Sequence, residues 1–294
     1  YALSTIGLGL YFSRRQKSMQ EYFTGGGNMN PILIGVSLFA TLLSTISYLS
    51  VPGEAAGKGP VNLISLLGLP VVFFVVGYLM LPIYMKFRVT SAYELLEEKL
   101  GLGLRLLGAT MFLALRMVWM TLLVYLASEA MTVMMGVEDK WIPLIVLITG
   151  LVAVTYTSLG GMRAVVITDL LQSILLLGGA LMVIVLVTID FGGFQWFPTS
   201  WQSNWDSQPL ISLDPGTRVT VLGSCLAVLL WQVCTAGGDQ TAVQRFMSTR
   251  DAQAARRSYL ISMLYGTAVL ATLSLVGFAL LGYFRTHAAA LPAN

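Results

Sequence analysis

The sequence predicts an all-α protein that crosses a membrane several times. Of its 294 residues, 56% are hydrophobic and 11% are charged, whereas soluble domains carry about 25% charged residues. The mean hydropathy is +0.78. Apolar runs of roughly 20 residues, the length that crosses about 30 Å of hydrocarbon, recur along nearly the whole chain. No soluble domain fits between these runs, so we expect one transmembrane domain over residues 1–294.

Seven apolar spans are expected after a short N-terminal helix at 1–12. That helix resembles the end of one already under way, because the chain opens on Tyr1 without an initiator Met or a signal-peptide pattern. The other end stops just after an apolar span, and we expect both ends to be trimmed. The seven spans are predicted near residues 31–51, 61–85, 103–134, 142–158, 164–189, 219–236 and 258–284.

Basic side chains fall mostly on one side of this arrangement. Because Lys and Arg gather in cytoplasmic loops, we expect loops 13–30, 86–102, 159–163 and 240–257 to be cytoplasmic and the N-terminal helix to start outside. The expected location is the plasma membrane, or the inner membrane of a bacterium. The outer loop 190–218 holds three Trp residues and is predicted to cap the membrane interface. No basic patch indicates nucleic-acid binding.

Two spans are interrupted by polar residues and helix breakers. The first carries six hydroxyl side chains between residues 37 and 50 and is expected to end at Pro52 and Gly53. The sixth runs into Gly237 and Gly238 and then Asp239. A pair of broken helices at corresponding positions, five helices apart, is typical of an inverted-repeat secondary transporter with its site near the bilayer midplane.

Four strings of residues resemble the sodium/solute symporter family, whose members carry sugars, proline, pantothenate, sialic acid, iodide, monocarboxylates and vitamins. They are YFTGGGNMNPILIGVSLFATLLS, LPIYMKFRVTSAYELLEEKLG, SLGGMRAVVITDLLQ and GGDQTAVQRFMSTRD, in this order. The resemblance implies a LeuT-type bundle of two inverted five-helix repeats after one extra helix. Residues 31–189 would form the first repeat and 219–284 the first two helices of the second. The bundle would be partial, without the helix that usually supplies hydroxyl ligands to sodium.

By position in the family motif, the resemblance implies a sodium site on the backbone carbonyls of Ala40 and Leu43, where SLFATLLS would unwind. The alternative is that hydroxyls here only bond back to the preceding turn or let helices pack closely. Asp169 begins another span, where a carboxylate costs roughly 3 kcal/mol unless it is paired or hydrated. Some family members use the matching acid for a second sodium. The alternative is an ion pair with Arg163 or another cytoplasmic-side base.

Arg116 is the one basic residue that the predicted topology places inside a span. Its planar guanidinium suits a carboxylate, and in the sialic-acid branch of the family an Arg on this helix grips the substrate carboxylate. The alternative is an internal pair with Glu129 or Asp169, or with backbone carbonyls. A direct pair with Glu129 is not expected, because it lies about 20 Å along the same helix.

Other positions imply an anionic solute rather than a sugar. Leu66 stands where sugar carriers place a Glu, and Thr235 stands where they place a gating Tyr. The string ISYLSVPGEAAG resembles the small-anion, vitamin and sialic-acid branches. Ser44 and Ser47 would then face an anionic group beside a half-helix N-terminus. The expected solute contacts are Thr41, Ser44, Ser47, Arg116 and Thr235.

The resulting prediction is a sodium-coupled symporter for a small organic solute, a carboxylate such as sialic acid or a monocarboxylate. A neutral or zwitterionic solute such as proline or a sugar, a channel, and a transporter-like sensor are the alternatives. An enzyme is not expected, because the chain has no HExxH motif and its one His, His287, falls in an outer loop. Cys225 and Cys234 are predicted as unpaired thiols. Sodium is the expected co-transported ion, with no organic cofactor, and the expected partners are the solute and the lipid bilayer.

Overall fold

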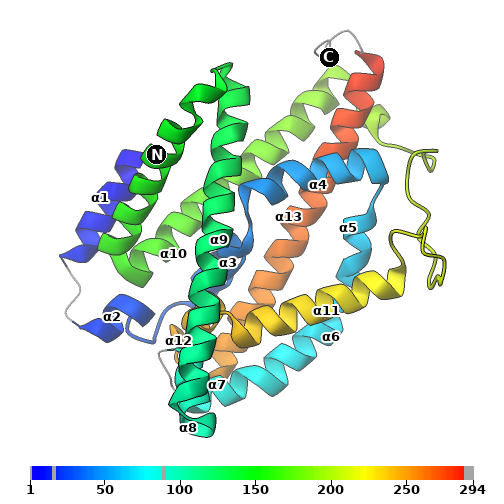
Figure 1. The fold of residues 1–294 in the computed structure, drawn as a ribbon. Coiled ribbons are helices and arrows are strands. Elements are labelled where there is room, and N and C mark those ends of the chain that lie inside the picture. Colours follow the sequence, from blue (N-terminus) through cyan, green and yellow to red (C-terminus); the bar gives the residue numbers. More distant parts are fainter. Residues whose placement is uncertain (1, 15–17, 88–90, 288–294) are drawn as a thin grey trace.

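The computed structural model describes residues 2–14, 18–87 and 91–287, and every element in these ranges is a helix (Figure 1). The elements η1 (Ser65–Gly68), η3 (Asp139–Trp141) and η4 (Phe194–Trp196) are short 3₁₀-helices, and η2 (Val75–Met80) is a π-helix. The α-helices are α1 (Ala2–Ser13), α2 (Met19–Thr24), α3 (Pro31–Leu42), α4 (Thr45–Lys58), α5 (Val61–Ile64), α6 (Leu69–Phe74), α7 (Leu81–Phe87), α8 (Ala92–Leu100), α9 (Leu102–Met135), α10 (Ile142–Asp190), α11 (Val221–Gly238), α12 (Gln240–Met247) and α13 (Ala252–Thr286).

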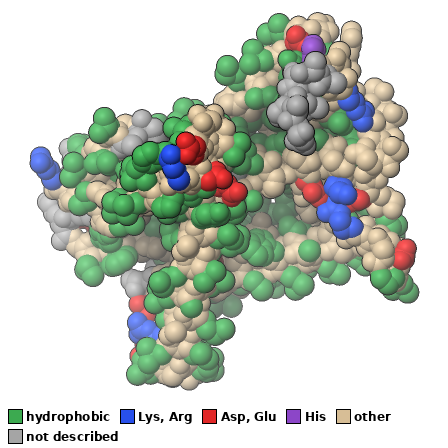
Figure 2. Space-filling view, turned by 45° about the horizontal axis from the view of Figure 1, so that its top comes forward, with side chains coloured by type: hydrophobic (Ala, Val, Ile, Leu, Met, Phe, Trp, Pro, Cys, Tyr) green, Lys and Arg blue, Asp and Glu red, His purple; other side chains and the backbone are tan. Residues whose placement is uncertain are grey.

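The long helices agree with the predicted spans. Continuous helical runs at Val61–Phe87, Leu102–Met135, Val221–Gly238 and Ala252–Thr286 are long and apolar enough to cross a membrane. The last begins at residue 252 rather than at the expected 258. Hydrophobic side chains cover most of the face shown in Figure 2, and Met117 and Val118 on α9 are 72% and 70% exposed. Apolar surface of this extent belongs in lipid or against other membrane helices, so the protein is a multi-pass membrane protein.

The predicted spans 142–158 and 164–189 lie within one element, α10. Its 49 residues would measure about 74 Å if straight, more than twice the roughly 30 Å of hydrocarbon. Gly161 interrupts it with φ 59° and ψ −167°, a conformation that glycine adopts at little cost. The chain reverses direction there (Figure 1), so α10 is long enough to cross twice.

The first interrupted span breaks between α3 and α4, which are bent by 73°. Leu43 and Ser44 are extended, and the Ser44 Oγ accepts a hydrogen bond from the Ser47 N–H at 3.1 Å. The unwinding expected in SLFATLLS is therefore confirmed. The expected end at Pro52 and Gly53 is wrong, because α4 continues to Lys58. Proline removes one helical hydrogen bond, and close packing of α4 on α13 offsets that loss.

The contact between α4 and α13 depends on Gly277. A Cβ atom there would lie 2.2 Å from the Pro52 carbonyl oxygen, whereas a Cβ at Gly53 would meet nothing within 4 Å. We expect Gly277→Ala to lower the free energy of unfolding by about 1–3 kcal/mol, the usual cost of overpacking. Gly53→Ala is the matched control and should change it little. Thermal unfolding of the two purified variants measures the difference, and equal melting temperatures would contradict this account of the packing.

The second interrupted span breaks at Asp239, between α11 and α12. Its backbone is extended, and its Oδ1 accepts a hydrogen bond from the Thr241 N–H at 2.8 Å, which caps α12. Helix α12 contacts α2, α3, α7, α8 and α13. The short helices α2, α8 and α12 gather at one end of the bundle (Figure 1). Both breaks therefore lie within packed protein, which is where interrupted membrane helices are tolerated.

The loop 190–218 covers the C-terminal end of α4. Trp205 Nε1 donates to the Ala56 carbonyl at 3.1 Å, and the Asp206 N–H donates to the Lys58 carbonyl at 3.1 Å. Trp196 and Trp205 are buried against α13, and Trp201 is 54% exposed. Two of the three Trp side chains in this loop therefore pack on protein, and the predicted role at the membrane interface stays a prediction.

Candidate functional site

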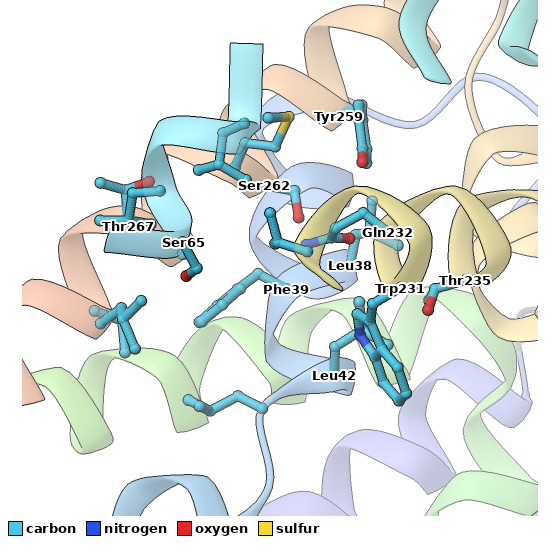
Figure 3. A pocket seen from close by; sticks show the side chains of 18 of the residues that line it. Leu38, Phe39, Leu42, Ser65, Trp231, Gln232, Thr235, Tyr259, Ser262 and Thr267 are labelled. Atoms are coloured by element: carbon cyan, nitrogen blue, oxygen red, sulfur yellow. The ribbon is translucent and has the colours of Figure 1, made fainter. Parts of the chain in front are cut away.

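A cavity of about 270 Å³ lies between the break of α3 and α4, the η1–α6 segment, α11, α12 and α13 (Figure 3). Apolar side chains form most of its wall. No charged side chain lines it among the residues that the structure describes. The polar lining consists of Ser47, Ser65, Gln232, Thr235, Tyr259, Ser262 and Thr267.

The helix break supplies polar atoms at one edge of this cavity. Leu43 and Ser47 line it, and the hydroxyl oxygens of Ser44 and Ser47 lie 3.0 Å apart. The last carbonyls of a helix have no partner within the helix. Phe39 still accepts a hydrogen bond from the Leu43 N–H, but Ala40 is followed by the unwound segment. Of the four residues predicted at this break, Leu43 and Ser47 line the cavity, whereas Ala40 and Ser44 lie beside them in the chain and are not part of its lining.

Thr235 and Leu66 also line the cavity, from α11 and from η1. Thr235 lies four residues before the second break, on α11 (Figure 3). The predicted solute contacts Ser47 and Thr235 therefore share one space. Thr41 and Arg116 do not line it.

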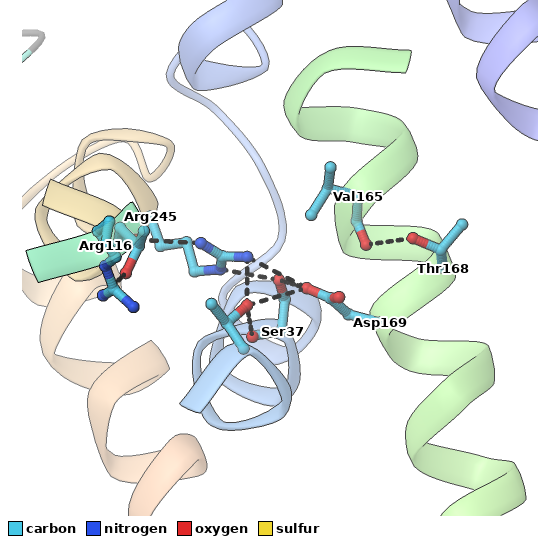
Figure 4. A network of polar contacts seen from close by, with 8 residues as sticks. Ser37, Arg116, Val165, Thr168, Asp169 and Arg245 are labelled. Carbon is cyan, nitrogen blue, oxygen red and sulfur yellow. Dashed lines mark hydrogen bonds and ion pairs between the residues drawn. The ribbon is translucent and has the colours of Figure 1, made fainter. Parts of the chain in front are cut away.

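Thr41 belongs to a buried polar cluster around Asp169 and Arg245 (Figure 4). Arg245 Nη2 lies 3.2 Å from Asp169 Oδ2, and the two side chains are 5% and 14% exposed. Ser37 Oγ donates to Asp169 Oδ2 at 2.5 Å and accepts from Arg245 Nε at 3.0 Å. Thr41 accepts a further hydrogen bond from Arg245. The cluster ties α3, α10 and α12 together.

Arg245 is the base that sequence reasoning left unnamed as the partner of Asp169. Arg163 pairs elsewhere: its Nε and Nη2 donate to the Gly25 carbonyl at 3.2 and 3.1 Å. Arg245 lies in the expected cytoplasmic loop 240–257, six residues after the second break, and α12 holds its side chain in the packed interior. The sequence did contain a signal for this pairing: Arg245 follows an interrupted span by only a few residues, so a short helix could place it near that break.

Arg116 pairs with Asp239 at the break between α11 and α12. Its Nη2 also donates to the Thr241 hydroxyl at 3.2 Å, and the Arg116 and Asp239 side chains are 24% and 20% exposed. An internal ion pair was the alternative for Arg116, and its carboxylate partner is Asp239 rather than Asp169, which pairs with Arg245. As expected, Arg116 does not pair with Glu129. In this structure Arg116 holds the second break and does not reach the cavity.

Two tyrosines that the sequence analysis did not single out close the same break. Tyr84 donates to the Gly237 carbonyl, and Tyr93 donates to the Gly238 carbonyl at 3.0 Å. Burial, followed by the nearby carboxylate of Asp239, raises the pKa of Tyr93 to about 12. Its hydroxyl is therefore protonated and able to donate at neutral pH. The carbonyls that α11 leaves free at its end are thus satisfied by α7 and α8.

Cys225 and Cys234 are free thiols, as predicted. Within the described ranges, no group of three or more His, Cys, Asp or Glu residues could hold a metal ion.

The sequence that forms these two broken helices also matches a family model. The model described as the sodium:solute symporter family matches residues 22–293. The chain belongs to the sodium:solute symporter family. This confirms the resemblance carried by the four sequence strings.

Relatives within this family are transporters by name. The chain is 30% identical to the sodium/sialic acid symporter SiaT of Proteus mirabilis over 311 residues, covering 100% of this chain and 59% of the relative. It is 28% identical to the sodium/sialic acid symporter NanT of Aliivibrio fischeri, covering 100% and 58%, and 29% identical to the human sodium/iodide cotransporter, covering 88% and 41%. This symporter-family chain thus spans about three fifths of the length of its sialic acid relatives, or less.

A solved structure confirms the fold. A Na⁺-coupled sialic acid symporter in a substrate-bound, outward-open state matches with a TM-score of 0.84 and 26% identity, covering 100% of this chain and 62% of that one. The family chain therefore has the LeuT-type helical fold that the resemblance implied, over the part of the bundle it spans.

Proposed function

We propose that the protein is a sodium-coupled symporter of a small organic solute that carries a carboxylate. The observation that supports this best is the cavity at the α3–α4 break, where an unwound backbone segment and hydroxyl groups lie beside an apolar wall. Ligand sites in transporters of this kind form at such discontinuous helices. A cavity of about 270 Å³ is near the lower end of the usual range of ligand pockets, which suits a small solute.

Sodium is proposed to bind the carbonyls of Ala40 and Leu43, with Asp169 serving a second sodium. Backbone carbonyls suit this hard cation, because they supply oxygen without adding charge. At Asp169 the ion would share the carboxylate with Arg245, which lies 3.2 Å from Oδ2. Competition between the two cations would couple sodium binding to the position of α12.

The solute carboxylate is proposed to lie at the N-terminus of α4, beside Ser44 and Ser47. Backbone N–H groups at a helix N-terminus favour negative charge, and the bound sodium would balance it within a neutral cavity. Thr235 would contact the solute from the opposite wall. We further propose that the protein lies in the plasma membrane, with α2, α8 and α12 on the cytoplasmic side, and that residues 31–189 and 219–284 belong to inverted repeats.

The test is uptake by proteoliposomes that contain the full-length protein. Sialic acid, lactate, pantothenate and proline are each offered with an inward sodium gradient and with an equal potassium gradient as control. We expect sodium-dependent uptake of at least one carboxylate. Uptake that is equal in both gradients would overturn the proposal. Sodium-dependent uptake of proline alone would instead favour a zwitterionic solute, which the lack of charged groups in the described cavity wall also allows.

A further inference from the structure

Tyr259 differs from the other tyrosines that pack inside the helix bundle. Its side chain is 3% exposed, and its hydroxyl has no hydrogen-bond partner among the described residues. By contrast, Tyr84 bonds the Gly237 carbonyl, Tyr48 the Leu176 carbonyl and Tyr265 the Ser173 carbonyl. A buried tyrosine hydroxyl usually has a partner, and leaving one unpaired costs about 1–3 kcal/mol.

Tyr259 lies at the wall of the cavity, and its hydroxyl oxygen is itself buried. Tyr259 is one of its lining residues, on the side of the second break, and the hydroxyl end of the ring is turned toward Gln232 and Ser262 (Figure 3). The ring is fixed in place: it packs edge-on against Phe246, with centroids 5.9 Å apart, and stacks on Phe73 at 6.5 Å. The hydroxyl is therefore held in one direction before anything binds.

We propose that the Tyr259 hydroxyl is a solute-binding group that bonds a neutral oxygen of the solute, a hydroxyl or a carbonyl, at the floor of the cavity. This inference rests on the proposed function and adds a second contact point to it. The carboxylate end lies at Ser44 and Ser47, and the neutral polar end lies among Tyr259, Ser262 and Gln232. The solute class is thus a carboxylate with further hydrogen-bonding oxygens, rather than a simple fatty acid.

The decisive variant is Tyr259→Phe, which removes the hydroxyl and keeps the packed ring. We expect the KM for sodium-driven sialic acid uptake to rise about tenfold or more, because a lost hydrogen bond in a desolvated site costs about 1–3 kcal/mol. Tyr265→Phe is the matched control on the same helix. Its hydroxyl already bonds the Ser173 carbonyl at 3.3 Å, so KM should change little.

Two further measurements separate a solute contact from a structural role. Without solute, Tyr259→Phe should melt at the same or a higher temperature, because it removes an unpaired polar group, whereas Tyr265→Phe should melt lower. The second measurement uses sialic acid analogues that each lack one hydroxyl. One of them should inhibit wild-type uptake more weakly than sialic acid does, and this difference should disappear in Tyr259→Phe.

An unchanged KM in Tyr259→Phe, or a clear loss of stability without solute, would overturn the inference and leave the symport proposal intact. Wild-type protein that takes up none of the offered carboxylates with sodium would instead contradict the proposed function, and this second contact with it.

Discussion

Replacing Arg245 with Met is expected to lower the free energy of unfolding by about 3–5 kcal/mol, the typical cost of leaving a buried charge without its partner. Asp169 would then be a carboxylate at 14% exposure whose bonds come only from neutral hydroxyls. Arg245 also bonds Ser37 and Thr41 on α3 and the Thr241 carbonyl on α12. The variant therefore loses the charge balance and the connection between three helices together.

The double variant Asp169→Asn/Arg245→Met should recover much of that loss, because both charges are then gone. Chemical unfolding of the purified protein gives the four free energies of this cycle. Arg163→Met is the matched control: its side chain is 47% exposed and its carboxylate partner, Glu21, is 3.9 Å away, so the change should stay within about 1 kcal/mol. Additive losses in the double variant would show that the pair is not coupled.

Sodium provides a second readout of the same cycle. If Asp169 serves a sodium ion, Arg245→Met frees the carboxylate for it. The variant should then gain more stability from added sodium than the wild type does, by mass action on the folded state. Potassium at equal concentration is the control for ionic strength.

The sequence predicted the helices and the breaks well, because both have local causes. Apolar runs fix the long helices, and the glycines and hydroxyls around residues 43 and 238 mark places where the helical hydrogen-bond pattern fails. Pro52 was misread because its effect depends on packing: α13 presents Gly277 to its carbonyl, so α4 runs through the proline. Nothing near Pro52 in the sequence reveals that contact.

Side-chain partners were harder to predict than the backbone. Arg245 and Asp169 are 76 residues apart, and Arg116 and Asp239 are 123 apart, so only tertiary packing decides which ion pairs form. Charge and topology restricted Arg116 to a few partners, yet the break at Asp239 changed which carboxylate lay within reach. Nothing in the sequence singles out Tyr259, because it is distinguished by the lack of a hydrogen-bond partner for its hydroxyl among the described residues, and only the packed structure reveals this.

Replacing Arg116 with Gln is expected to lower the maximal rate of sodium-driven uptake by about tenfold or more, with a small change in KM. Arg116 pairs with Asp239 at the second break, below the cavity wall formed by Thr235 and Ala236. A surface ion pair contributes about 0–1 kcal/mol. Arg116 and Asp239 are about three-quarters buried or more, so losing their ion pair should cost more than that. The variant should therefore populate conformations in which the break is no longer held, and fewer molecules would complete the transport cycle.

The comparison with Asp239→Asn decides between this role and a solute-binding one. If the pair holds the break, Asp239→Asn should give the same phenotype as Arg116→Gln, and the double variant should be no worse than either, because both remove one interaction. If Arg116 instead grips the solute carboxylate, Arg116→Gln should raise KM by a factor of about ten to a hundred or more, since a charged hydrogen bond contributes about 1.5–3 kcal/mol. Asp239→Asn would then free the guanidinium and lower KM. A higher KM in Arg116→Gln together with a lower KM in Asp239→Asn would therefore show that Arg116 binds the solute.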